Sequence, residues 1–236
     1  MKKISKIFCM ILAVCLMIPA ICLLSACEPD NVVTVSTFEE LQTALSGDKE
    51  IIKLNADIDA TTEIKVSRKI ILDLNGKKIY NSKDIWLDDE NGVNIVAALI
   101  SVKENGDLTI KGNGIIHGKA YDCFAAETVG GKLTVEDGTF IGNVHAIYVY
   151  KGELIINGGE YSIQQKSDIK ADEYVINCYD EFYKDGTAKV TIKGGEYKIF
   201  NPANCYAEGP NTNFVAEGYK SVLKEGSTDI YQVVAE

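Results

Sequence analysis

The 236-residue chain is poor in arginine, histidine and tryptophan. It contains one arginine (Arg68), two histidines (His117 and His145) and one tryptophan (Trp86). The 34 acidic residues outnumber the 24 basic ones, and the formal net charge is −10. Because nucleic acid binding depends on clustered basic side chains that neutralise phosphates, this composition excludes nucleic acid as a partner.

Cysteine motifs typical of metal sites are also absent. The seven cysteines form no Cys-x-x-Cys pair, and no cysteine–histidine spacing points to zinc, so no metal site is predicted from them. Cys123, Cys178 and Cys205 stand alone in the second half of the chain. We interpret them as small apolar core residues, with one disulfide among the three as the alternative.

Residues 1–26 have the features of an export signal. Lys2, Lys3 and Lys6 precede an apolar run that ends in Leu-Ser-Ala-Cys at Cys27. This ending resembles the lipobox of bacterial lipoproteins, and the resemblance implies that Cys27 is diacylated and becomes the mature N-terminus. Residues 27–35 would then be a tether, and the rest would face outward from the cell envelope. The alternative is an uncleaved membrane anchor, since the apolar run has the ~18 residues that a membrane-spanning helix needs.

Five segments of the chain share one pattern. Apolar residues recur at positions 0, +2 and +7, and glycine occupies +4, +5 or both. Position 0 is Leu72, Leu108, Leu133, Leu154 and Val190 in the five copies, and a weaker sixth copy starts at Ile52. Each copy predicts a short strand, a glycine turn and the start of a second strand, which is the unit of a β-solenoid.

The outward positions of the copies support stacking in register. Position −1 alternates in charge along Asp107, Lys132, Glu153 and Lys189. In the same four copies position +1 is β-branched: Thr109, Thr134, Ile155 and Thr191. Neighbouring strands lie about 4.8 Å apart, so both columns would place compatible side chains next to each other.

Both ends of the predicted stack have a cap. Residues 36–47 predict a helix, with Ser36 or Thr37 as N-cap, Glu39 or Glu40 completing a capping box, and Gly47 at the end. The coils span 50–200, and residues 201–236 predict one or two closing strands. The whole domain is therefore 36–236.

This arrangement resembles the right-handed parallel β-helix of the pectate-lyase-like superfamily, over residues 33–236. The resemblance implies an all-β fold, a single-stranded solenoid of about six coils with a short N-terminal capping helix, on a bacterial surface lipoprotein. It does not extend to catalytic motifs. Arg68 lacks the surroundings of a lyase arginine, and only Ile-Ile-His-Gly-Lys around His117 approaches the Gly-His-Gly segment of polygalacturonases. The fold alone does not carry the activity.

Three groups of residues are candidate sites. Glu160 and Glu196 occupy position +6 of neighbouring copies, where stacking would bring their carboxylates about 5 Å apart, the separation found in retaining glycosidases. The alternative is a solvated turn edge that tolerates charge.

The other two groups lie in insertions. The first insertion, around residues 81–94, combines Trp86 with Asp84, Asp88 and Asp89, which suits sugar stacking or calcium. The alternative is a disordered or locally packed insertion. The second carries Tyr179 and Tyr183, which would share a groove with Trp86 if both insertions lie on one face; the alternative is that these aromatics pack in the core or in turns. His117 and His145 are interpreted as structural.

The expected function is non-catalytic binding of extracellular carbohydrate, a host glycan or an envelope partner, without a required cofactor. Two alternatives remain. One is a carbohydrate-active enzyme, a polysaccharide lyase or glycoside hydrolase, and the other is a structural spacer.

Overall fold

The computed structural model describes residues 30–165 and 174–236, and most of their strands belong to two parallel sheets. The first sheet runs in the order β1 (Val32–Val35), β2 (Ile51–Leu54), β5 (Lys69–Asp73), β10 (Asp107–Lys111), β12 (Phe124–Val135), β14 (Ile147–Ile156) and β16 (Ile176–Cys178). It also contains β4 (Ile64–Val66), β9 (Ala98–Lys103) and β17 (Ala188–Ile192).

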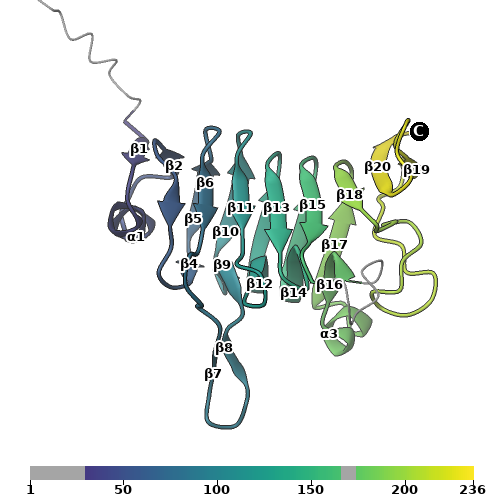
Figure 1. Cartoon of the computed structure of the whole chain (residues 1–236), viewed down its shortest axis with the longest axis horizontal. Helices are drawn as coiled ribbons and strands as arrows, with labels where there is room; N and C mark the ends of the chain where they lie inside the picture. Colours follow the sequence, from purple (N-terminus) through teal and green to yellow (C-terminus); the bar gives the residue numbers. More distant parts are fainter. Residues whose placement is uncertain (1–29, 166–173) are drawn as a thin grey trace, which may run out of the picture.

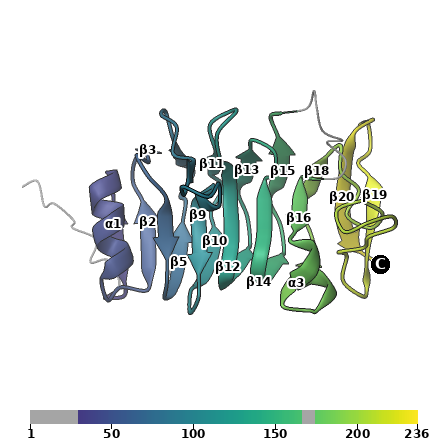
Figure 2. The same cartoon turned by 90° about the horizontal axis from the view of Figure 1, so that it is seen from below.

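The second sheet runs β3 (Ile58–Asp59), β6 (Lys78–Tyr80), β11 (Ile115–His117), β13 (Thr139–Gly142), β15 (Glu160–Ile163) and β18 (Glu196–Lys198). From β5 onward the chain passes back and forth between the two sheets, and equivalent strands of successive passes lie side by side (Figures 1 and 2). The prediction of an all-β fold built from parallel strands is confirmed.

Long strands divide the first sheet into two halves. The first part of β12 pairs with β9 on one side and with the start of β14 on the other. The start of β14 pairs in turn with β16. The second part of β12 pairs with β10 on one side and with the end of β14 on the other. The end of β14 pairs in turn with β17. The half made of β4, β9, β12, β14 and β16 carries the groove described below.

The core lies between the sheets and is built from the alternating apolar residues of each strand. Its largest members form an aromatic stack on the second sheet. The rings of Phe140 and Tyr161 lie 5.4 Å apart, and those of Tyr161 and Tyr197 lie 4.9 Å apart with an interplanar angle of 10°. Each tyrosine hydroxyl donates to a carbonyl three residues earlier, on Gly158 and Gly194. The polar tip of each buried ring therefore has a partner.

The twin Gly-Gly-Glu-Tyr segments need their glycines for two reasons. Gly159 and Gly195 have φ values of +93° and +94°, a region that residues with a side chain rarely adopt. A Cβ on Gly194 would lie 2.1 Å from the Asn157 carbonyl oxygen, so the backbones of these two successive segments approach too closely for any side chain.

The predicted outward columns are confirmed. Asp107 pairs with Lys132, Lys132 with Glu153, and Glu153 with Lys189. The ammonium group of Lys132 lies 3.4 Å from the Glu153 carboxylate.

The predicted alignment is wrong at two points. Leu72 pairs with Ile110 rather than with Leu108, so the first copy is shifted by two residues. In the second copy Ile116 is buried, whereas Ile115, predicted to face inward, is 38% exposed. The stretch from Leu108 to Ile116 is one residue longer than the matching stretch from Leu133 to Phe140, and that residue moves the inward position.

Both caps are present. Helix α1 (Phe38–Ser46) begins at the N-cap Thr37, which forms the predicted capping box with Glu40, and it ends at Gly47. At the other end, β19 (Tyr219–Leu223) and β20 (Ile230–Ala235) pair antiparallel with each other, and β20 pairs antiparallel with β18. Residues 32–35, assigned to the tether from sequence, instead form β1 and pair with β2.

The predicted signal peptide and Cys27 lie outside the described residues. Within 30–165 and 174–236, no helix has the length and apolar character to cross a membrane.

Two insertions depart from the stack on the same side of the molecule. One is the antiparallel hairpin of β7 (Leu87–Asp88) and β8 (Asn94–Val96), and the other contains the short helix α3 (Asp180–Lys184). Figure 1 shows both extending from the lower edge of the strands.

Candidate functional site

A groove of about 620 Å³ crosses the outer face of β12, β14 and β16, between the β7–β8 hairpin and the start of α3. Val93 and Ile95 of the hairpin line one side, and Tyr179 and Asp180 line the other. Because strands β12, β14 and β16 are parallel and in register, they present equivalent outward side chains in rows.

One row forms the floor of the groove, and we call it the floor row. Glu127, Tyr148 and Asn177 are register partners on β12, β14 and β16. All three line the groove. The side-chain oxygen of Asn177 is buried and has no hydrogen-bond partner among the described residues. A buried amide oxygen without a donor is costly, so a ligand group that donated to it would remove that cost.

Aromatic rings surround the floor row. Tyr148 stacks on His145 at 5.1 Å, and Phe124 packs against both. A second cluster consists of Tyr150, Tyr179 and Phe182, whose ring centroids lie 5.1–5.2 Å apart. Flat aromatic surface next to hydrogen-bonding groups is the usual lining of a small-ligand site.

His145 is a neutral acceptor in this groove. Its Nδ1 lies 2.7 Å from the carbonyl oxygen of Tyr174, and because a carbonyl can only accept, Nδ1 carries the proton. The other ring nitrogen, Nε2, is then unprotonated. Burial lowers the pKa of His145 to about 4, so the ring stays neutral at physiological pH.

A buried ion-pair network anchors Glu127 at the edge of the floor row. The carboxylate of Glu127 accepts a hydrogen bond of 2.8 Å from the Ser101 hydroxyl and lies 3.8 Å from the Lys103 ammonium. The same ammonium lies 2.6 Å from Glu63, whose side chain is fully buried. Burial is the main cause of the raised pKa of Glu127, and the nearby Glu63 adds to it.

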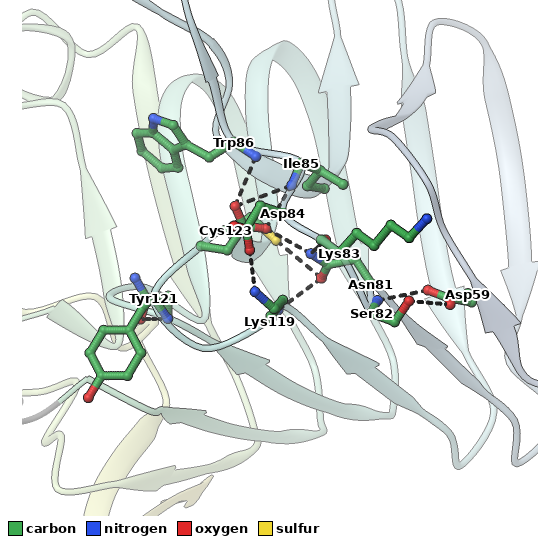
Figure 3. A network of polar contacts seen from close by, with 12 residues as sticks. Asp59, Asn81, Ser82, Lys83, Asp84, Ile85, Trp86, Lys119, Tyr121 and Cys123 are labelled. Carbon is green, nitrogen blue, oxygen red and sulfur yellow. Dashed lines mark hydrogen bonds and ion pairs between the residues drawn. The ribbon is translucent and has the colours of Figure 1, made fainter.

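The hairpin that bears Trp86 is held at its base by Asp122. The buried Asp122 carboxylate accepts from the backbone N–H groups of Ile85 and Trp86 and from the side-chain amide of Asn81. Asn81 in turn accepts from the backbone N–H of Lys119. Figure 3 shows this network below Ile85 and Trp86, with Tyr121 pointing away from it.

The predicted residues of the first insertion do not form one site, because each has a different contact. Trp86 packs edge-on against Phe124 at 5.6 Å, next to the groove, and its indole N–H donates to Asp88. Asp84 forms an ion pair with Lys119, and Asp89 accepts from the backbone of Asn91 and Val93 in the hairpin turn. In the part of the chain that the structure describes, no three acidic, histidine or cysteine side chains form a cluster suited to a metal ion.

The two predicted tyrosines of the second insertion separate. Tyr179 lines the groove and contacts Tyr150. Tyr183 is turned toward the core side, where it packs edge-on against Phe214 at 5.8 Å. Of the three predicted aromatic residues, Tyr179 therefore lines the groove, Trp86 contacts the lining residue Phe124 but does not itself line the groove, and Tyr183 lies elsewhere.

Glu160 and Glu196 are register partners on β15 and β18, as the repeat predicts. They belong to the second sheet, away from the groove. Glu196 bonds to Lys224 at 2.6 Å, and the two glutamates border a shallow depression of about 320 Å³. None of the described residues that line this depression is aromatic, and the Glu196 carboxylate is already paired with Lys224.

The three core cysteines are buried free thiols, so no disulfide links them. Cys178 lines the groove, and burial raises its pKa.

Sequence reasoning missed the floor row and its surroundings: Glu127, Tyr148, Asn177, Lys103 and His145. Their alternation with apolar neighbours indicates outward positions, but no local signal shows that these positions are covered by two insertions. Comparison of the chain with family models, with curated proteins and with solved structures finds no significant match.

Proposed function

We propose that this protein binds extracellular carbohydrate, without turning it over, in the groove between the β7–β8 hairpin and α3. It would be exported, anchored to the membrane through a lipid on Cys27 and oriented outward. In this proposal the two sheets are faces of a right-handed parallel β-helix of the pectate-lyase-like kind, displayed at the cell surface. The export-signal pattern, the Leu-Ser-Ala-Cys sequence and the parallel strand order support these elements.

The floor row carries the proposal. Tyr148 offers an aromatic face for the C–H side of a sugar ring, and hydrogen-bond acceptors flank it on the neighbouring strands, on Glu127 and Asn177. With strands about 4.8 Å apart, a ring resting on Tyr148 could donate hydroxyl hydrogens to both. The Asn177 oxygen supports this assignment most directly, because it has no partner among the described residues.

A binding role fits this geometry better than catalysis. Hydrolysis by two carboxylates requires one of them to be free to transfer a proton and the other to face the reacting carbon or a water. In the groove, Glu127 and Glu63 hold the same Lys103 ammonium, and Glu127 also accepts from Ser101. Both contacts of Glu127 involve Oε1, so this oxygen is not free to transfer a proton.

The test is retention of the full chain, in mild detergent, on a panel of immobilised neutral, acidic and amino polysaccharides. We expect retention on at least one, a loss of about tenfold or more in affinity for Tyr148→Ala, and near-normal affinity for Tyr148→Phe, which keeps the ring. Tyr80→Ala, an aromatic truncation on the second sheet, should bind normally.

Two outcomes would overturn the proposal. Absence of retention on every polysaccharide, or retention that Tyr148→Ala leaves intact, would leave the spacer role. Release of new sugar ends that stops with Glu127→Gln would establish an enzyme instead.

A further inference from the structure

The groove lining carries more negative than positive charge, and this excess distinguishes sugars by their own charge. Among the described residues, Lys103 is the one lysine or arginine in the lining. Its ammonium already lies 2.6 Å from Glu63 and 3.8 Å from Glu127. A bound anion would have to compete with two carboxylates for that ammonium, so the groove offers an acidic sugar no available positive charge.

The remaining polar groups of the lining mostly accept hydrogen bonds. Asn177, only 9% exposed, has an amide oxygen without a partner among the described residues, and the neutral His145 ring can only accept through Nε2. Asp180, the first residue of α3, adds an exposed carboxylate to the lining. Its nearest cation is Lys184 at 3.7 Å, on the same helix and largely in solvent.

Aromatic rings complete a setting suited to a positive charge. Tyr148, Tyr150 and Tyr179 line the same groove as these acceptors. Tyrosine rings attract cations through their electron-rich faces, and the attraction grows when the site is partly shielded from water. A protonated amine would satisfy several acceptors at once, since it has three donors.

We infer that the groove selects sugars that carry a free, protonated amino group over neutral sugars and over uronic acids. This inference rests on the proposed carbohydrate-binding function and names the class of its ligand. The ammonium of the sugar would lie between the floor row and Asp180, with the sugar ring against Tyr148.

The experiment compares three β-1,4-linked hexamers that differ only at C2: glucose, N-acetylglucosamine and glucosamine. Binding of each to the full chain is measured by calorimetry at one ionic strength and at a pH where the glucosamine amine is protonated. The glucosamine hexamer should bind about tenfold or more tightly than the glucose hexamer, because charge-assisted hydrogen bonds are roughly twice as strong as neutral ones. The N-acetylated hexamer has no positive charge and should show no such gain.

Variants locate the effect. Glu127→Gln and Asp180→Asn each remove one negative charge from the groove with little change in shape, and each should reduce the preference for the glucosamine hexamer several-fold. Glu104→Gln removes an exposed charge just after Lys103 but outside the lining, and it should retain the wild-type ratio.

The outcomes separate the two proposals. Equal binding of the glucose and glucosamine hexamers, or tightest binding of the N-acetylated one, overturns the amine preference and leaves the carbohydrate-binding function intact. Absence of binding to all three hexamers, together with failure of the wider polysaccharide panel, overturns both. A preference that persists unchanged in Glu127→Gln and in Asp180→Asn would also contradict the assigned position of the amine.

Discussion

Glu208 shows how burial changes the chemistry of one side chain next to the groove. One of its carboxylate oxygens accepts from the backbone N–H of Cys178 at 3.0 Å, and the other is buried without a hydrogen-bond partner among the described residues. Burial is the main cause that raises its pKa from 4.5 to about 7, and nearby Asp180 adds to the shift. The folded state therefore holds this proton more tightly than the unfolded chain does.

The raised pKa predicts a pH-dependent stability difference. Between pH 4.5 and about 7 the folded state binds more protons at Glu208 than the unfolded state, so its contribution to stability falls as pH rises through this window. Glu208→Gln keeps the acceptor for Cys178 but never ionises. We expect the variant to exceed the wild type in unfolding free energy by about 1–2 kcal/mol at pH 8, after allowance for solvent screening, and to match it at pH 4.

Urea unfolding of both proteins at pH 4, 6 and 8 checks this difference. The exposed Glu217→Gln is the matched control and should follow the wild type at every pH. A gap that is the same at pH 4 and pH 8 would rule out the titration of Glu208 as its source.

The strands and the base of the β7–β8 hairpin are held differently. In the strands and turn, Leu87, Val93 and Ile95 are 51%, 61% and 49% exposed, so little apolar packing stabilises them. At its base, three N–H groups converge on the buried Asp122. The position of Trp86 beside Phe124 therefore depends mainly on one carboxylate that lies 36 residues further along the chain.

Removing that carboxylate should release the hairpin base. Asp122→Ala leaves the buried N–H groups of Ile85, Trp86 and Asn81 without their acceptor, and we expect a loss of about 1–3 kcal/mol in unfolding free energy. Hydrogen exchange should become faster at the Ile85 and Trp86 amides than in the wild type.

Asp84→Ala is the control for this experiment, because it removes a neighbouring carboxylate whose partner is the partly exposed Lys119. Exchange at Ile85 and Trp86 should be unaffected in this variant. Equal acceleration in both variants would show that the whole loop, rather than Asp122, positions the hairpin.

At the level of the whole molecule, stability depends on contacts between successive passes of the chain. Phe140, Tyr161 and Tyr197 come from three neighbouring strands and form one continuous aromatic stack inside the core. Tyr161 is the middle member, so it contributes to two interfaces at once. In a stacked architecture each unit is stabilised mainly by its neighbours.

Truncation of this ring should be costly. Tyr161→Ala removes contacts with both neighbours and leaves a cavity, and we expect a loss of about 3–5 kcal/mol in unfolding free energy. Tyr161→Phe loses only the hydroxyl bond to the Gly158 carbonyl, for which about 1 kcal/mol is expected. Chemical denaturation measures both.

The 81%-exposed Tyr121 supplies the control, and its replacement by alanine should leave stability unchanged. A small loss for Tyr161→Ala, similar to that for Tyr161→Phe, would mean that neighbouring rings close the cavity and that the stack is not the main contact between passes.

The amino-acid sequence by itself determined the strands of the repeat, the register of β10, β12, β14 and β17, and the two caps. Alternation of apolar residues indicates which side of each strand is buried, and the Asp107–Lys132–Glu153–Lys189 column indicates register, because outward side chains on adjacent strands must be compatible. The Thr37 and Glu40 capping box is equally local. The alignment was wrong around Leu72 and Ile115, where a turn of different length changes which residue faces inward.

The groove was decided only by the tertiary structure. Tyr148 comes 21 residues after Glu127, and Asn177 comes 29 residues after Tyr148. The three residues meet because parallel pairing places them on one row. Whether an outward residue is solvated or lines a site depends on what covers it, here a hairpin and a short helix from distant insertions. The prediction that Glu160 and Glu196 are neighbours is correct. The aromatic and acceptor groups nevertheless gather on the first sheet, because burial depends on packing in space rather than on repetition in sequence.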